Sequence, residues 1–367
     1  MAKSKNKFNP ILTLFLCVVF ACIGVVVGGY GYLLYKSNKE IGEINVYTSG
    51  EIAFHFLELG NDRTGDCTYI KAGDVDILID AGSRVNSIPT ITSYINNYVT
   101  DNKLEYVVVT HAHRDHYAGF ATDESEESIF DKYEIGTIID FAQTKQTKGM
   151  YLDYLRERSE AIDKGAVHYT AKECVDKTNG ASDIFDLGND INMKILDQKF
   201  YHEKDSGTDE NNYSVCTLFS QGENNHFLLT GDLEKKGEES LVAKNELPHC
   251  KLFKAGHHGS GTSSNDVLLN EITPEICTVC CCAGSDEFTD INENQFPTQE
   301  FIDRISKHTE KVYVTTLYKD ETFTSMNGNI IVSFNGASVK VDCSNNNMLL
   351  KDTEWFKQNR NCENWVN

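Results

Sequence analysis

Four side chains of metal-ligand type follow directly after an apolar run that ends at Val109. Residues 110–116 read Thr-His-Ala-His-Arg-Asp-His, which places ligands at His111, His113, Asp115 and His116. In an extended segment the first two imidazoles project to the same side, and a turn would bring the last two ligands onto an adjacent ion. Imidazole and carboxylate together suit Zn²⁺, with Mn²⁺ or Fe as alternatives. The run therefore predicts a strand whose end opens into a site for two divalent ions.

Three further segments have the same form, an apolar strand that ends in an acid or in paired histidines. They contain "LIDAG" with Asp80, "LLTGDLE" with Asp232, and "KAGHHGS" with His257 and His258. We expect Asp232 to bridge two cations, although the same residue could instead begin a helix as its N-cap. Asp80 is expected to orient a ligand from behind. For the histidine pair, either member could be a ligand, and an ordinary surface loop is the alternative.

In their order along the chain, these motifs resemble those of the metallo-β-lactamase-fold hydrolases, over roughly residues 50–340. The residues within each motif are most similar to those of the hydrolase domain of ComEC-type DNA-uptake proteins. They are more distantly similar to those of the phosphorylcholine esterase domains that act on teichoic acid. The resemblance implies an α/β fold, the αββα metallo-β-lactamase sandwich. It also implies a metal-activated water as nucleophile, with Asp115 and Asp232 as the predicted catalytic residues.

Three segments depart from the family pattern. Many members carry a further histidine ligand where this chain has residues 211–214, Asn-Asn-Tyr-Ser, which would leave the first metal with His111, His113 and Asp232. The loop 60–66 is longer than the usual Gly-x-Gly-Asp, and residues 294–297 replace a common Gly-His-Pro. The residues expected to contact substrate oxygens are Asn212, Ser214 and Lys254.

The amino-terminal segment predicts a membrane anchor, because Ile11 to Tyr35 is 25 uncharged, mostly apolar residues, enough to cross about 30 Å of hydrocarbon. Three lysines precede it and two follow, a slight bias that favours a cytoplasmic amino terminus and an extracytoplasmic hydrolase. The expected organisation is a cytoplasmic segment 1–10, a transmembrane helix 11–35, a juxtamembrane linker 36–48, a hydrolase domain 49–343 and a peripheral tail 344–367.

Charge restricts the class of substrate. The first 40 residues carry a net charge of +4, so the remainder carries −25 of the total of −21. Such a surface repels long polyanions, whereas nucleic-acid binders present basic stripes. We therefore expect a phosphodiesterase that acts on a phosphodiester-containing substrate such as an envelope polymer, using two divalent ions, with Zn²⁺ expected and Mn²⁺ the alternative. A ComEC-like nuclease that acts on DNA and a non-catalytic, metal-stabilised binding module are the other hypotheses.

Local patterns predict helices near 89–100, 151–164, 263–271 and 298–309. Strands are expected near 51–59, 67–71, 75–80, 105–110, 311–316, 321–325 and 329–335. The polar loop 197–212 is long enough to cover the metals, and His202 could reach them from it. Four of the twelve cysteines lie in Ile276 to Ala283, which reads as a buried strand rather than a zinc site because successive side chains point to opposite faces. Free thiols in an exported protein would indicate an anoxic habitat or the reverse orientation.

Overall fold

The computed structural model describes residues 51–123, 126–205 and 207–366, which lie in one compact unit, Tyr47–Asn367. The predicted cytoplasmic segment, anchor and linker all fall outside the described residues and stay predictions. Within the described ranges, no helix is both long enough and apolar enough to span a bilayer.

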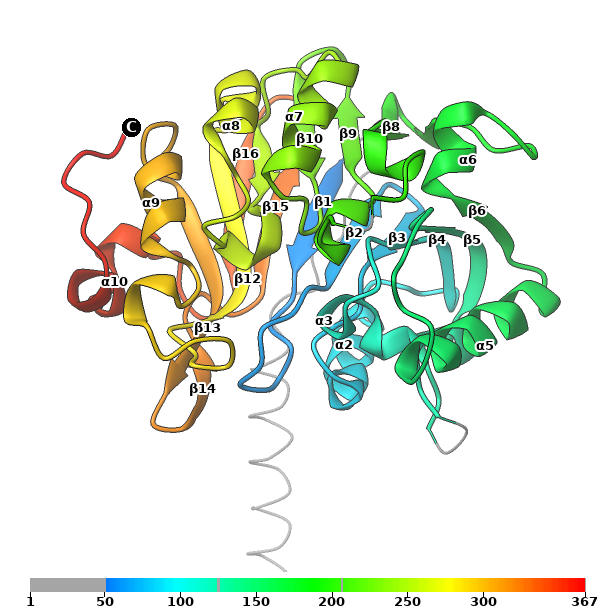
Figure 1. Ribbon diagram of the computed structural model, residues 1–367, viewed down its shortest axis with the longest axis horizontal. Helices are drawn as coiled ribbons and strands as arrows, with labels where there is room; N and C mark the ends of the chain where they lie inside the picture. The colour runs from blue at the N-terminus through cyan, green and yellow to red at the C-terminus, as the bar shows by residue number, and fades with distance from the viewer. Residues whose placement is uncertain (1–50, 124–125, 206, 367) are drawn as a thin grey trace, which may run out of the picture. The chain divides into compact units, whose positions relative to one another are not determined.

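Two eight-stranded sheets form the frame of this unit (Figure 1). The first has the order β16-β15-β1-β2-β3-β4-β5-β6, in which β3 to β6 run parallel and the other neighbours antiparallel. Its strands are β1 (Ile52–Phe56), β2 (Thr68–Ala72), β3 (Val75–Ile79), β4 (Lys103–Val109), β5 (Glu134–Asp140), β6 (Val167–Thr170), β15 (Ile330–Phe334) and β16 (Val339–Cys343).

The second sheet has the order β14-β13-β12-β11-β10-β9-β8-β7, with β10 to β13 parallel. Its strands are β7 (Ile184–Gly188), β8 (Ile191–Ile195), β9 (Thr217–Gln221), β10 (Asn225–Leu229), β11 (Leu252–Lys254), β12 (Ile276–Ala283), β13 (Val312–Lys319) and β14 (Thr322–Ser325). Because β15 and β16 return to pair beside β1, the chain closes its first sheet only near its end.

Helices cover the outer face of each sheet, which gives the four-layered αββα arrangement (Figure 1). The α-helices are α2 (Ile88–Ile95), α3 (Arg114–Tyr117), α4 (Ile129–Lys132), α5 (Met150–Asp163), α6 (Ala171–Asp176), α7 (Lys235–Lys244), α8 (Asp266–Ile272), α9 (Gln299–Ile305) and α10 (Glu354–Asn359). Short 3-10 helices include η3 (Lys199–Tyr201), η4 (Glu210–Tyr213) and η5 (Gly256–Gly259).

Aromatic side chains hold the two sheets together. The ring of Phe54 on β1 lies 4.9 Å from that of Phe227 and 5.4 Å from that of Phe219, both on the second sheet. Phe334 on β15 lies 4.4 Å from Phe227. These fully or nearly fully buried rings remove large apolar areas from water, and so they fix the distance between the strand ends that carry the site.

Most expected elements exist, with ends moved by a few residues. Strand β12 is buried throughout, and all ten cysteines of the described residues are free thiols. This agrees with the prediction that the Cys-rich segment is a buried strand of the core. The tail is not peripheral: α10 packs on the second sheet, with Leu350 and Phe356 buried. Arg360 donates to the carbonyl oxygens of Pro297 and Gln295, so polar contacts also tie the tail down.

Candidate metal centre

The site lies where four strands of the two sheets end. Strands β3 and β4 deliver Asp80 and the run that begins at His111, while β10 and β11 deliver Asp232 and the His257–His258 pair. Parallel neighbours present their carboxyl ends at the same edge, so each pair of loops lies side by side. The packing of the two sheets then brings both pairs of loops into contact.

The loop after β4 has the geometry expected for its ligands. His113 is extended, with φ −99° and ψ 143°, and caps α3, which carries Asp115 and His116 one turn further on. The Nε2 atom of His111 lies 3.1 Å from the Nδ1 atom of His113. The extended segment and the short helix thus divide the four ligands into two groups.

Asp80 fixes the base of this loop from behind. Its backbone has φ +58°, and its carboxylate accepts hydrogen bonds from the N–H and hydroxyl of Thr110, at 2.8 and 2.7 Å. The same carboxylate lies 2.8 Å from Nδ1 of His116. A proton on Nδ1 leaves the Nε2 lone pair facing the site, which is the tautomer that a metal needs.

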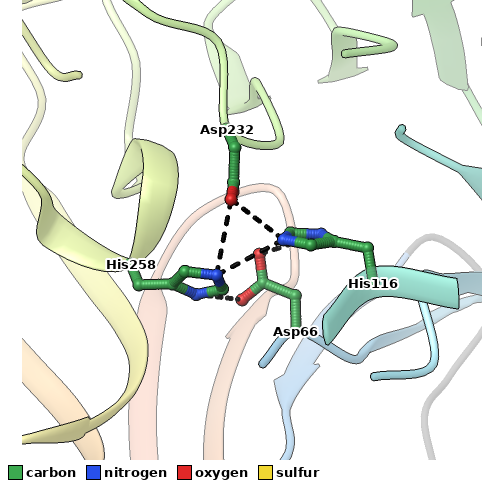
Figure 2. A group of neighbouring side chains, drawn as sticks. All are labelled: Asp66, His116, Asp232 and His258. Carbon is green, nitrogen blue, oxygen red and sulfur yellow. Dashed lines mark hydrogen bonds and ion pairs between the residues drawn. The ribbon is translucent and has the colours of Figure 1, made fainter. Parts of the chain in front are cut away.

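A first group of possible ligands is closely packed around His258 (Figure 2). Its Nε2 atom lies 3.4 Å from Oδ2 of Asp232, 3.4 Å from Oδ2 of Asp115 and 3.3 Å from Nε2 of His116. His116 Nε2 lies 3.0 Å from Asp232 Oδ2. Ligands of one tetrahedral Zn²⁺ at bond lengths near 2.1 Å stand about 3.4 Å apart, so these residues fit a divalent cation.

The tautomer of His258 is also fixed by the protein. Its Nδ1 atom lies 2.9 Å from the carbonyl oxygen of Cys280. A carbonyl oxygen only accepts, so Nδ1 carries the proton and Nε2 is left to bind a cation. His257, in contrast, lies 3.0 Å from the hydroxyl of Thr262 and faces the open cavity. Of the two histidines, the structure groups His258 with the other candidate ligands.

Asp66 is the principal site residue that the sequence reasoning missed. It is buried, forms a short ion pair with Lys254, and lies 3.5 Å from Nδ1 of His258 and 3.7 Å from Nδ1 of His116. Although its oxygens are close enough to the cluster to join a ligand set, they face the rear nitrogens of both imidazoles. We therefore interpret Asp66 as orienting the ligands. The Gly-Asp pair that ends the long loop 60–66 is the sequence signal that could have identified Asp66 as a site residue.

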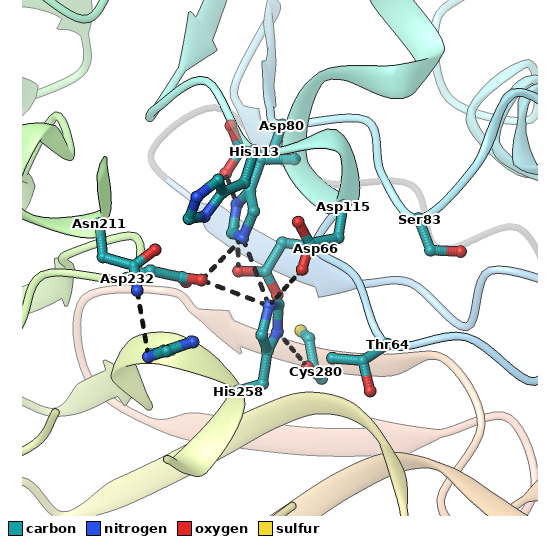
Figure 3. Close-up of polar contacts among 12 residues, drawn as sticks. Thr64, Asp66, Asp80, Ser83, His113, Asp115, Asn211, Asp232, His258 and Cys280 are labelled. Carbon is teal, nitrogen blue, oxygen red and sulfur yellow. Dashed lines mark hydrogen bonds and ion pairs between the residues drawn. The ribbon is translucent and has the colours of Figure 1, made fainter. Parts of the chain in front are cut away.

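A second group contains His111, His113 and one edge of Asp232, of which Figure 3 labels the last two. Nε2 of His111 lies 3.9 Å from Oδ2 of Asp232, and the other carboxylate oxygen of Asp232 is buried without a hydrogen-bond partner. Ser214 supports this side, because its hydroxyl accepts from the Asp232 N–H at 3.0 Å and lies 3.4 Å from Nδ1 of His111. Asp232 thus borders both groups, the position required of a bridging ligand.

The electrostatic field of the site favours cations. Burial lowers the pKa of His116, but Asp232 and Asp80 more than offset this, so its pKa lies well above the ordinary value. Burial also lowers the pKa of His258, but Asp232 and Asp66 more than offset this and raise the pKa to about 10. Burial raises the pKa of Asp115, yet the hydrogen bond with His258 brings it well below its usual range. Carboxylates that hold protons on imidazoles would hold a divalent ion in the same place.

A cavity of about 460 Å³ opens beside these ligands. Arg84 and Arg114 line it together with His113 and Asp115, and the rings of Phe288 and Phe296 form an apolar wall. Glu287 holds Arg84 at the rim through a short ion pair. The ring of Phe296 lies 5.7 Å from that of His257 and 5.8 Å from that of His258, so the apolar wall reaches the histidine pair.

The residues predicted to contact substrate or to support the ligands from behind do not line this cavity. Ser214 and Lys254 are buried behind the ligands, and the side-chain oxygen of Asn212 accepts from the Gly237 N–H at 3.2 Å. Asn211, one residue earlier, lines the cavity instead. His202 does not reach the metals, because its Nε2 atom lies 2.8 Å from Asp197 at the surface. Sequence patterns do not show which face of a 3-10 helix or a short strand meets the cavity.

Comparison with known proteins gives a consistent picture. Residues 60–122 match the family model of the Metallo-beta-lactamase superfamily. The chain is 32% identical over 123 residues to Competence protein ComA of Neisseria gonorrhoeae, which is 33% of this chain and 17% of that protein. It is 28% identical over 127 residues to ComE operon protein 3 of Bacillus subtilis (strain 168), which is 34% of this chain and 15% of that protein. The chain thus spans less than a fifth of these relatives.

Among solved structures, the metallo-beta-lactamase fold protein YhfI of Bacillus subtilis aligns with 75% of this chain and 99% of its own, at 11% identity and a TM-score of 0.41. The two-sheet fold, the motifs and the match over residues 60–122 are similar to the metallo-β-lactamase superfamily, a likeness that in general suggests a metal-dependent hydrolase. Within that class, the chain resembles the hydrolase domain of ComEC-type competence proteins.

Proposed function

We propose that this protein is a membrane-anchored, extracytoplasmic, metal-dependent phosphodiesterase. The observation that carries the proposal is that Arg84 and Arg114 line the same cavity as His113 and Asp115. Guanidinium groups recognise phosphate oxygens through paired, charge-assisted hydrogen bonds. A cavity with two of them beside a divalent-metal ligand set suits a phosphodiester better than a neutral amide or ester.

The bound cations would supply a water activated near neutral pH and would polarise the phosphoryl oxygen. The protein's own groups do the rest. Asp80 holds a proton on Nδ1 of His116, and the Cys280 carbonyl holds one on Nδ1 of His258, so both imidazoles keep their metal-binding nitrogen free. Asp115 and Asp232 supply negative charge beside them. Arg84 and Arg114 would bind the two non-bridging oxygens and orient the diester.

A nuclease is the second candidate, because the curated relatives are competence proteins. The charge of −25 beyond residue 40 argues against it, since non-specific binding to DNA depends on many lysines and arginines and weakens steeply with salt. We therefore expect small phosphodiesters to be hydrolysed at least as readily as long DNA.

The decisive experiment is hydrolysis of bis(p-nitrophenyl) phosphate by the full-length, detergent-solubilised protein, in competition with plasmid or single-stranded DNA across a range of salt. Arg84→Ala and Arg114→Ala should each raise KM by roughly tenfold or more, the loss of one charge-assisted contact. Arg156→Ala is the matched control, because this arginine lies outside the cavity lining and should leave KM unchanged. A strong preference for long DNA that falls steeply with salt would establish the nuclease instead.

The predicted topology has a separate test. Protease added to intact cells should digest the residues beyond 40, and permeabilised cells should show the same products. Complete protection in intact cells would place the hydrolase inside, where the free thiols of the described residues would be ordinary.

A further inference from the structure

Asn211 lines the cavity together with His113 of the second ligand group. It lies in η4, where Asp209 caps the helix by accepting from the Asn211 N–H at 3.2 Å. Its side chain is only 3% exposed, yet it borders the cavity together with His113 and Asp115. Figure 3 shows its amide nitrogen directed away from His113. The amide is therefore held at the metal centre rather than in solvent.

The neighbours of Asn211 determine which end of its amide faces the ligands. Its Nδ2 atom lies 3.4 Å from a carboxylate oxygen of Glu234 and 3.5 Å from Nδ1 of His257. A carboxylate accepts hydrogen bonds, so the nitrogen belongs on this side and the oxygen on the other. That oxygen is buried and has no hydrogen-bond partner.

Asp232 also has a buried carboxylate oxygen without a hydrogen-bond partner. This oxygen is Oδ1, whereas Oδ2 contacts the first ligand group. Buried oxygens in folded proteins are almost always paired. One of the two unpaired oxygens belongs to Asn211, which lines the same cavity as His113, and the nitrogens of His113 and His111 lie 3.1 Å apart. A cation would satisfy such a set of unpaired oxygens and imidazole nitrogens.

We propose that the amide oxygen of Asn211 is a protein ligand of the second ion, with His111, His113 and Asp232. The proposal rests on the two-metal site of the proposed function. It gives the centre two unequal halves: one built from Asp115, His116, Asp232 and His258, and one in which a neutral amide stands in place of an imidazole.

The inequality has a chemical consequence. Imidazole nitrogen suits Zn²⁺, whereas carbonyl oxygen suits harder ions such as Mn²⁺ and Mg²⁺. The half that contains Asn211 should therefore bind Zn²⁺ more weakly than the other half and should discriminate less between Zn²⁺ and Mn²⁺. At limiting zinc, the protein should fill one site first and take up the second ion only at higher concentration.

The test uses the full-length protein in detergent, stripped of metal and equilibrated by dialysis against buffered Zn²⁺ or Mn²⁺, with metal content measured directly. Asn211→Leu, which is close in size, should weaken the second Zn²⁺ by at least the 10- to 100-fold typical of perturbed metal sites and leave the first unchanged. Asn211→His should tighten the second Zn²⁺ by tenfold or more and raise the preference for Zn²⁺ over Mn²⁺ at that site.

Asn212→Ala is the matched control. It disturbs the same 3-10 helix by removing the acceptor for the Gly237 N–H, and it should leave both metal affinities within threefold of the wild type. If Asn211→Leu fails to fold, Asn211→His still decides the matter, because it restores a ligand instead of deleting one.

Unchanged second-site affinity in Asn211→His, or binding of a single ion by the wild type at all concentrations, would overturn the proposal. Neither result depends on the reaction catalysed. A protein that binds two unequal ions but hydrolyses no diester would instead contradict the proposed function while leaving the role of Asn211 intact.

Discussion

The two loops that carry the histidine motifs reach the same site by different physical means. In the first loop, which follows β4, His113 is extended and Asp115 and His116 begin a regular helical turn. In the second, which follows β11, His257 and His258 have φ +46° and +56°, both in the left-handed region. For a residue other than glycine this conformation costs about 1–2 kcal/mol, so the second loop needs external support.

That support comes from two buried charged residues distant in sequence. Arg304 on α9 donates to the carbonyl oxygens of Gly261, Ser263 and Ser264 at 2.8 to 2.9 Å. Glu238 on α7 accepts from the N–H groups of Ser264 at 2.6 Å and of Asn265 at 3.0 Å. The comparison teaches that a ligand motif can be local in sequence while its geometry depends on remote residues.

The largest expected effect separates the two histidines of the second loop. His258→Ala should reduce activity by at least ~100-fold and remove one metal, since even outer contacts of metal sites contribute 10- to 100-fold. His257→Ala should retain both metals, because its ring contacts Thr262 and the cavity. Metal analysis with diester hydrolysis checks both variants. Loss of metal in His257→Ala alone would reverse the assignment of the ligand.

The next effect concerns the support of that loop. Arg304→Ala should lower the free energy of unfolding by roughly 3 kcal/mol, because a buried, charged donor to several carbonyl oxygens is lost. The exposed Lys357, which pairs with Glu354 on its own helix, provides the comparison, and Lys357→Ala should cost under about 1 kcal/mol. Urea denaturation of both variants measures the difference. Equal losses would show that Arg304 does not support the loop.

The smallest expected effect is a pH dependence. Burial raises the pKa of Glu238 from 4.5 to about 7, although hydrogen bonds from Asn265 and Ser264 oppose the shift. The folded state therefore holds a proton that the unfolded state releases. The stability from this proton is present in full below pH 4.5 and decreases as the pH rises toward 7, with a slope of up to about 1.4 kcal/mol per pH unit.

Glu238→Gln removes this titration. Urea denaturation between pH 5 and 8 should show a shallower decline in the variant than in the wild type, with the difference confined to the window below about pH 7. Parallel curves for the two proteins would mean that the carboxyl group does not bind the extra proton.

The sequence alone indicated the strand ends and their ligands because these features are local. An apolar run followed by histidines, as at His111, or by an aspartate, as at Asp232, specifies both a buried strand and the ligand at its end. The Cys-rich strand was also readable, since eight successive small or apolar residues leave no polar face. The edge strands β6, β7 and β16 have partly or fully exposed positions on both faces. Their sequences therefore lack a clear alternation of apolar and polar residues, and these strands were not predicted.

Only the tertiary structure decided which side chains share the cavity. Asp66 and Lys254 pair across 188 positions of the chain, and Asn211 rather than Asn212 faces the ligands because Asn212 is turned toward Gly237. The same holds for His258 against His257, because only His258 lies with Asp232 and His116. Periodicity and motif spacing act over a few residues, whereas burial and pairing in this site depend on how two sheets pack. The sequence therefore determined the kind of chemistry, and the packing of the sheets determined the residues that are placed to perform it.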